Sequence, residues 1–244
     1  MSGHSKWHKI QNKKGKNDKA RSAAFTKLLN GVTIAAQQGG GDVDMNFALR
    51  LAVQKAKAGN VPKDNIDRAI KRGTGESSDG VVFEEGLYEG FGPGGVAMLV
   101  ETLTDNANRT ITEVKTAFTK NGGSFGSSGS VSWQFEHLGV ITVPLNALVE
   151  KNVSKDDFEL AMMDAGMTDL QEDDQYLVLK CHKEDFHKLS EAVAGYGIEP
   201  EDSGLAWVAK EPIDVDDETM EKMGKLYEVL DESDDVREIY TNLR

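Results

Sequence analysis

The chain has 244 residues, of which 39% are hydrophobic, and its formal net charge is −13. This length accommodates one large domain or a few small ones, and the apolar content excludes a wholly disordered protein. No apolar run approaches the roughly 20 residues of a membrane helix, and the single cysteine excludes an internal disulfide and multi-cysteine zinc motifs. Because the N-terminus also lacks the apolar stretch of a signal peptide, we expect a cytoplasmic protein without a membrane partner.

Charge is divided unevenly along the chain. Up to Arg72 there are 15 Lys and Arg against 5 Asp and Glu, a balance of +10. The remaining residues contain 13 Lys and Arg against 36 Asp and Glu, a balance of −23. A basic segment is attracted to a polyanion, whereas an acidic one is repelled by it. The sequence therefore predicts a nucleic-acid partner that is bound through the N-terminal part of the chain.

Residues 1–17 are predicted to form a mobile basic arm. Trp7 and Ile10 are its only large apolar side chains and show no helical spacing, so the segment cannot bury enough surface to offset the ordering of its backbone. The Trp7 indole either stacks on an unpaired base or packs the arm against the next domain. The arm residues predicted to contact nucleic acid are Lys6, Trp7, Lys9, Lys13, Lys14 and Lys16.

Residues 18–73 are predicted to form a nucleic-acid-binding domain of three helices. Apolar spacing predicts the first helix at about 19–38 and the second from after Asp44 to Gly59. The third takes Pro62 as its first residue and Gly73 as its terminator. For this third helix, an ordinary solvated charged face is the alternative to a binding surface. The basic residues predicted to bind are Lys19, Arg21 and Lys27 on the first helix, and Lys63, Arg68, Lys71 and Arg72 on the third.

Residues 74–80 have the Gly and Ser content of a linker and lie where the charge changes sign, which predicts a domain boundary. Strands are expected at 88–91 and 96–103. A helix is expected at 110–120, with Thr110 and Glu113 as its capping box. Alternation of apolar and polar residues then predicts a half-buried strand at 131–136.

A βαββαβ series follows in residues 137–209, which is the order of a ferredoxin-like domain. A helix at 216–230 and a strand at 236–241 come after it and have no sheet of their own. They are predicted to complete the unit that began before the series. The expected fold is therefore α+β with three domains: a three-helix domain and two ferredoxin-like α/β domains, of which the middle one is discontinuous (81–136 plus 210–244).

No catalytic or cofactor motif is convincing. Gly90, Gly92 and Gly95 match G-x-G-x-x-G, but they lie between two expected strands and indicate a tight hairpin rather than a dinucleotide site. The Gly- and Ser-rich loop 122–130 lacks the Lys-Ser/Thr ending of a P-loop and suits a flexible connection; its alternative is a backbone cradle for phosphate or a loop that orders on binding RNA or protein. We expect no enzyme, no cofactor, no metal and no small-molecule substrate.

Several motifs between residues 3 and 136 resemble the YebC family, which is similar to the mitochondrial translational activator of cytochrome oxidase. Two departures are Val43 and Phe47, where the family often has proline, and they affect local geometry rather than charge. The motifs that carry the resemblance are Gly3–Trp7, Lys19–Arg21, Phe25–Leu28, Gly39–Asp42, Asn60–Ile66, Arg68–Ile70, Tyr88–Gly95, Leu103–Asn106, Asn108–Thr110, Asn121–Gly123 and Gly129–Val131.

The resemblance implies one of two functions: a DNA-binding transcriptional regulator, or a ribosome-associated factor that contacts ribosomal RNA and relieves difficult translation, such as at proline runs. The glycine-rich stretch between the first two helices does not fit a helix-turn-helix, and a long basic arm suits irregular RNA. A third alternative is a protein-interaction module whose acidic domains bind a basic partner. The sequence thus favours a non-enzymatic nucleic-acid-binding regulator of gene expression.

Overall fold

The computed structural model describes residues 18–76 and 83–244, with side chains from residue 24 onward. The predicted arm 1–17 and most of the predicted linker lie outside the described residues. The chain forms two compact units, one of which is Glu136–Val208. The other combines the described residues before Glu136 with Ala209–Arg244, so the chain leaves this unit and later returns to it.

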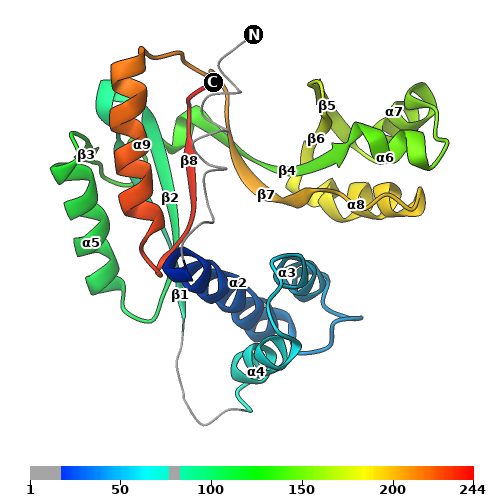
Figure 1. Cartoon of the computed structure of the whole chain (residues 1–244), viewed down its shortest axis with the longest axis horizontal. Coiled ribbons are helices and arrows are strands. Elements are labelled where there is room, and N and C mark those ends of the chain that lie inside the picture. Colours follow the sequence, from blue (N-terminus) through cyan, green and yellow to red (C-terminus); the bar gives the residue numbers. More distant parts are fainter. Residues whose placement is uncertain (1–17, 77–82) are drawn as a thin grey trace. The chain divides into compact units, whose positions relative to one another are not determined.

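Three helices form the N-terminal part of the described chain (Figure 1): α2 (Asp18–Gly39), α3 (Phe47–Ala58) and α4 (Lys63–Gly73). Their apolar faces meet in one core. Val32 and Leu49 are fully buried there, and Ile66 of α4 is nearly so. The predicted three-helix domain is thus confirmed.

Helices α3 and α4 end at the predicted glycines, with Gly59 as the C-cap of α3 and Gly73 as the last residue of α4, but the left-handed turns lie further along the chain. The left-handed residue after α3 is Asn60, with φ of 59°, and the amide of Val61 donates to the carbonyl of Ala56 as in a Schellman motif. Gly73 does not end α4 by a left-handed turn; Gly75, with φ of 76°, does so. Gly73 instead permits close packing against α2, because a Cβ at this position would lie 2.2 Å from the carbonyl oxygen of Thr33.

Asn46 joins the end of α2 to the start of α3. Its Oδ1 accepts the amide N–H of Leu49 at 3.0 Å and so caps α3. Its amide nitrogen donates to the carbonyls of Ala35 and Gly40 at 2.7 and 2.8 Å. Because the side chain is buried, water cannot easily replace it as the hydrogen-bond donor to these carbonyl groups.

The middle sheet combines strands from both ends of the chain. Its order is β3-β1-β2-β8, with β1 (Glu84–Phe91), β2 (Ala97–Thr104), β3 (Ser124–Phe125) and β8 (Val236–Thr241). The last strand, β8, pairs antiparallel with β2. This pairing is what makes the middle domain discontinuous, as the sequence predicted.

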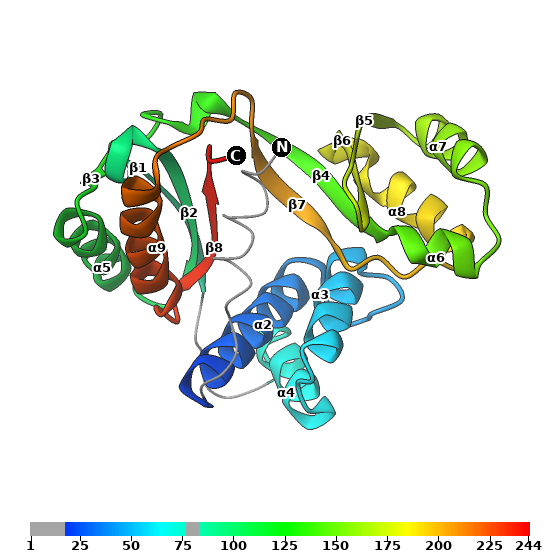
Figure 2. The ribbon, with the colours of Figure 1, turned by 45° about the horizontal axis from the view of Figure 1, so that its top comes forward.

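Helices α5 (Ala107–Lys120) and α9 (Asp217–Asp231) pack on this sheet (Figure 2). Phe118 of α5 and Met223 and Leu226 of α9 are fully buried in one core with Met98 and Val100 of β2. Since Met98 and Val100 are two residues apart on the strand, they lie on the same face of the sheet. Both helices therefore cover one face.

Two predicted boundaries in this region are wrong. The cap of α5 is Asn106, whose side chain accepts the amide of Arg109, so the helix begins about one turn before the predicted Thr110–Glu113 box. Residues Ser132–Gln134 form a 3-10 turn rather than part of a strand. The amides of residues 131 and 132 bind the Glu89 carboxylate instead of a neighbouring strand, which explains the difference.

The elements of the inserted unit in chain order are β4 (Phe135–Pro144), α6 (Leu145–Glu150), α7 (Lys155–Asp164), β5 (Met167–Glu172), β6 (Tyr176–His182), α8 (Phe186–Gly195) and β7 (Asp202–Ala209). Its strands have the ferredoxin-like order β5-β6-β4-β7. The short helix α6 was not predicted.

Among the described residues, no helix is both long and apolar enough to span a membrane.

We expect Asn46→Ala to lower the free energy of opening of α3 by about 2–3 kcal/mol, because it removes the helix cap and two buried hydrogen bonds. Native-state hydrogen exchange of the α3 amides measures this, since it reports the helical domain rather than the whole chain. Asn108→Ala, at an exposed position of α5, is the control and should change exchange little. Unchanged α3 exchange in Asn46→Ala would show that the cap is dispensable.

Candidate nucleic-acid interface

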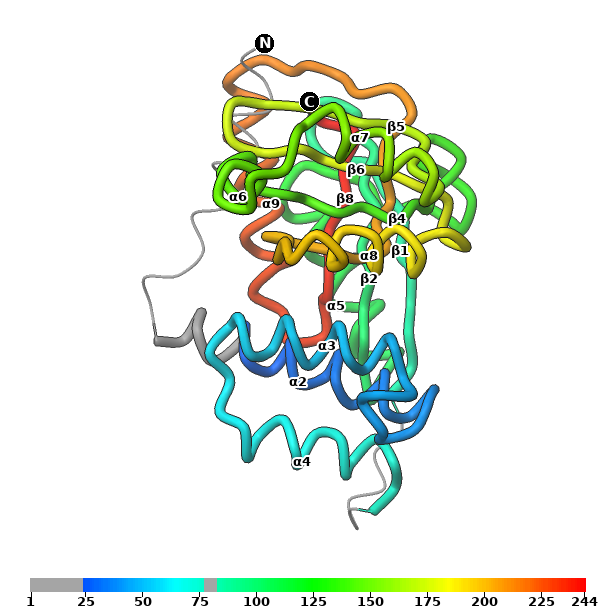
Figure 3. The backbone as a smooth tube through the Cα atoms, turned by 90° about the vertical axis from the view of Figure 1, so that its right-hand side faces the viewer, coloured from blue at the N-terminus to red at the C-terminus, as the bar shows by residue number. Residues whose placement is uncertain are grey.

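Helix α4 presents a buried face and a basic outer face. Ile66 and Ala69 are buried against the other two helices, which run beside α4 in Figure 3. Because an α-helix completes one turn every 3.6 residues, side chains that do not share the face of Ile66 and Ala69 point outward. The four residues that the sequence singled out on this helix are all exposed: Lys63, Arg68, Lys71 and Arg72.

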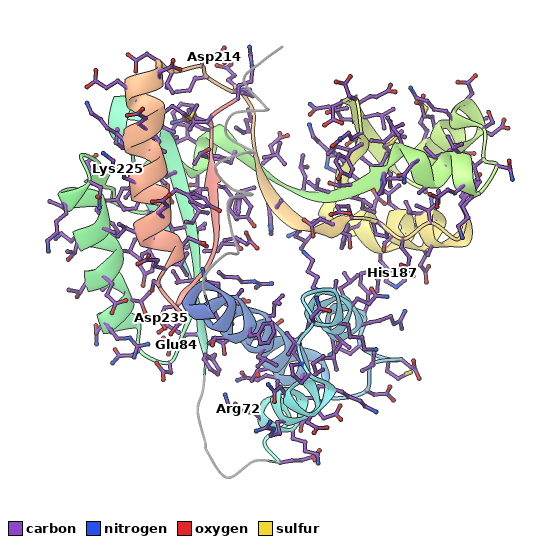
Figure 4. All side chains as sticks on the ribbon, in the orientation of Figure 1. Arg72, Glu84, His187, Asp214, Lys225 and Asp235 are labelled. Atoms are coloured by element: carbon purple, nitrogen blue, oxygen red, sulfur yellow. The ribbon has the colours of Figure 1, made fainter. Side chains whose placement is uncertain are left out.

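The cations on this face are not neutralised within the helical domain. In the part of the chain that the structure describes, Lys63, Lys71 and Arg72 have no ion-pair or side-chain hydrogen-bond partner. Arg68 donates to uncharged acceptors, the carbonyl of Asp64 at 3.1 Å and the side-chain oxygen of Asn65. Figure 4 labels Arg72 on this helix. Basic residues in the last turn of a helix also interact favourably with the helix dipole and stabilise the helix, typically by about 0.3–1 kcal/mol. This is their ordinary structural role.

Charge is ordered along α4. Its acidic residues, Asp64 and Asp67, lie in the first half, whereas Arg68, Lys71 and Arg72 lie in the second. The connection between α3 and α4, residues 59–62, has the length of a helix-turn-helix turn, a comparison that sequence reasoning did not make. A recognition helix, however, contacts bases with its N-terminal residues. Here that end would bring two carboxylates toward phosphates, so α4 suits phosphate contact through its C-terminal half.

Helix α3 adds basic residues that sequence reasoning missed. It has three basic and no acidic side chains, a signal that was present in the sequence. Arg50 is occupied internally, because its guanidinium donates to the carbonyls of Val43 and Asp44 at 3.2 and 2.6 Å. Lys55 and Lys57, in the last turn, are exposed. They extend the set of surface cations on the helical domain.

Of the remaining predicted binding residues, the structure describes the side chain of Lys27 alone, and Lys27 does not join this surface. Lys27 is largely buried, with 13% of its side chain exposed, and its Nζ donates to the carbonyl and carboxylate oxygens of Asp231 at 2.6 and 2.9 Å. Lys27 is therefore used for internal contact rather than left for a ligand. Lys19 and Arg21 lie on the first turns of α2, where side chains are not described. The arm residues Lys6, Trp7, Lys9, Lys13, Lys14 and Lys16 lie outside the described residues.

Gly129, at the end of the Gly- and Ser-rich loop 122–130, and the two residues that follow the loop form a cradle of amide groups, but a carboxylate of the protein occupies it. Glu89 of β1 is 5% exposed and accepts the amides of Gly129, Val131 and Ser132 at 2.6, 2.7 and 2.8 Å. Burial raises the pKa of Glu89, but the donors outweigh it and the pKa is lowered overall. The loop is thus held by an internal anion and does not offer these amides to a phosphate.

The G-x-G-x-x-G match is a hairpin, as the sequence predicted. It joins the antiparallel strands β1 and β2 through a 3-10 turn, with φ of 72° at Gly94 and 76° at Gly95. A Cβ at Gly92 would lie 2.4 Å from the Sδ of Met223. The glycines therefore serve the turn and its packing on α9.

No metal-binding group of three or more His, Cys, Asp or Glu occurs among the described residues. Cys181 is fully buried, and burial, with a smaller effect of Asp185, raises its pKa to about 11. A thiol in this state is a poor nucleophile.

Glu89→Gln should reduce the free energy of unfolding by about 2 kcal/mol at neutral pH, because an amide nitrogen replaces one oxygen that faces N–H donors. Since the pKa of Glu89 is lowered by folding, its contribution is present above the ordinary glutamate pKa of about 4.3 and is lost as pH falls through the folded value. The difference between wild type and variant should therefore shrink in acid. Urea unfolding at several pH values tests this.

The control is Glu84→Gln, which changes an exposed carboxylate on the same strand and should have little effect at any pH. A wild-type advantage over Glu89→Gln that does not change between neutral pH and pH 3 would contradict the role assigned to the carboxylate.

The sequence of residues 5–76 matches the family model of the TACO1/YebC protein N-terminal domain, and residues 83–243 match that of the TACO1/YebC second and third domain. A protein of Halothermothrix orenii named probable transcriptional regulatory protein is 44% identical, covering 99% of this chain and 94% of that protein. One of the same name from Nitratiruptor sp. is 45% identical over 100% of both chains.

The crystal structure of a conserved hypothetical protein from Aquifex aeolicus, Aq1575, has a TM-score of 0.80 to this structure at 37% identity. The similarity covers 92% of this chain and 90% of that one. Sequence and fold therefore agree over nearly the whole length, and the chain belongs to the TACO1/YebC family.

Proposed function

We propose that this protein is a non-enzymatic, nucleic-acid-binding regulator of gene expression. The observation that carries the proposal is the uncompensated basic half of α4, which lies on the basic part of an otherwise acidic chain. A helix face with free cations is ready to replace the counterions of a phosphate backbone. The non-enzymatic part follows from the sequence, where no catalytic constellation can be argued.

The negative charge of the other two domains supports binding of nucleic acid through the helical domain. Residues 136–208 contain 5 Lys and Arg against 16 Asp and Glu, a balance of −11. Residues 83–135 with 209–244 contain 8 against 18, a balance of −10. Residues 18–76 contain 10 against 6 and are therefore the basic part of the described chain. Phosphates are attracted to the helical domain and repelled by the rest.

Transcriptional regulation is the first candidate role. It is supported by the relatives named probable transcriptional regulatory protein, which are about as long as this chain and similar over its whole length. This role makes duplex DNA the first target to test.

A ribosome-associated role is the second candidate, and the order of charges along α4 favours it. Contact through the C-terminal half of the helix binds phosphates rather than base edges, so it does not recognise a DNA sequence directly. Folded RNA is recognised largely through its shape, backbone and unpaired bases. Under this alternative the protein contacts ribosomal RNA and relieves stalled translation, for example at proline runs.

The triple change of Lys63, Lys71 and Arg72 to Gln should weaken binding and reduce the salt dependence. If each cation contacts one phosphate, the slope of log affinity against log salt falls by about 2.7 for duplex DNA and about 2.1 for a single strand. Fluorescence anisotropy of the full chain over a salt series measures both. Duplex DNA and a structured ribosomal RNA fragment of equal length are the probes.

The matched control changes Lys115, Lys120 and Lys225 to Gln. These lysines are exposed on α5 and α9, as Figure 4 shows for Lys225, and the net charge changes equally. Retained affinity in the control together with loss in the α4 variant supports the proposed surface. Equal losses would mean that only total charge matters, and a wild-type slope near zero would exclude nucleic-acid binding.

A further inference from the structure

Helix α7 of the inserted domain has apolar residues on two faces. Phe158 and Met162 are fully buried in the core of that domain. Leu160 and Met163 point the other way, and each is 62% exposed. At a spacing of three residues these two side chains are neighbours on the helix surface. A helix at the surface of a globular domain normally has one apolar stripe, so the second requires an explanation.

Carboxylates flank the exposed pair on the side of Leu160. Asp156, Asp157 and Asp164 are three or four residues from Leu160 and therefore lie beside it, and all three are exposed. Within the described chain none of them has an ion-pair partner. Two cations lie near α7: Lys155 is paired with Glu159 and Glu172, and the Nζ of Lys188 donates to the backbone carbonyl of Asp164 at 2.7 Å. The exposed face therefore has an apolar pair with carboxylates beside Leu160.

Helix stability does not explain this arrangement. Asp156 and Asp157 lie in the first turn, where carboxylates favour the helix dipole. Asp164 lies in the last turn, where a carboxylate is unfavourable. The positive charge at that end comes from Lys188 of α8, whose Nζ donates to the Asp164 carbonyl rather than to its carboxylate. A single exposed leucine is ordinary, whereas an adjacent exposed leucine and methionine form an apolar centre of the kind that an interface encloses in a polar rim.

We propose that the α7 patch, defined as Asp156, Asp157, Leu160, Met163 and Asp164, binds a basic protein surface that presents an apolar side chain flanked by Lys or Arg. Charge complementarity selects this occupant, because a domain with a balance of −11 repels nucleic acid and anionic lipid. The flexible Met163 side chain adapts to the shape of the partner's apolar group. This role is separate from nucleic-acid binding by the helical domain.

The probe is a synthetic helical peptide with two leucines on one face and lysines around them. Two matched peptides replace the leucines by serine or the lysines by glutamate. We expect the full-length protein to bind the first peptide in a salt-dependent way and the other two at least about tenfold more weakly, because the apolar anchor and the charges both contribute. Fluorescence anisotropy measures the affinities.

Leu160→Ser with Met163→Ser should weaken binding of the first peptide by about tenfold or more. Asp156→Asn, Asp157→Asn and Asp164→Asn together should weaken it and reduce its salt dependence. The control, Val149→Ser with Val229→Ser, removes two exposed valines elsewhere and should leave the affinity unchanged. Circular dichroism should show every variant folded, because the changed side chains are exposed.

A photo-crosslinking residue placed at position 160 in cells identifies the natural occupant. Cross-links to a basic protein support the proposal. Cross-links to nucleic acid or to a second copy of this chain would overturn it. Equal binding of the lysine peptide with serines, equal loss in the valine control, or no binding of the first peptide would also overturn it.

Discussion

Repulsion between carboxylates and phosphates limits which part of this chain can approach a nucleic acid. Two of the three domains carry a large excess of Asp and Glu, and the helical domain carries an excess of Lys and Arg. Residues 136–208 are inserted as a unit of their own, and the chain returns to the middle sheet through β8. On this basis we propose that a polyanion binds the helical domain and that the acidic inserted domain binds a basic partner.

The order of the expected helices and strands along the sequence was enough to predict most of the fold. The predicted strand at 236–241 corresponds to β8, and its assignment to the earlier sheet follows from its lack of a partner nearby in sequence. The start of α5 was missed because Thr110 and Glu113 have the spacing of a capping box. In the structure the Thr110 hydroxyl instead donates to Asp235 at 2.8 Å, a contact that joins distant parts of the chain. Local pattern carries no information about such a partner.

The candidate site was predictable to the extent that it depends on one helix. The exposed cations of α4 follow from helical spacing and from the buried positions of Ile66 and Ala69. The internal use of Lys27 was not predictable, since its partner Asp231 lies in α9. The same is true of Glu89, whose carboxylate fills the amide cradle of a loop that begins more than thirty residues later. In each case the charged side chain is bound by a partner elsewhere in the same chain, which only the tertiary structure brings close.

Cross-linking of the protein to nucleic acid in cells, followed by sequencing of the attached fragments, is the direct test of binding through α4. We expect recovery of nucleic acid by the wild type and by the control that changes Lys115, Lys120 and Lys225, and a strong decrease for the α4 variant. Fragments from promoters would identify the transcriptional role, and fragments of ribosomal RNA the translational one. Recovery no greater than for an unrelated acidic protein would exclude nucleic-acid binding, and equal recovery by the α4 variant would exclude α4 as the binding surface.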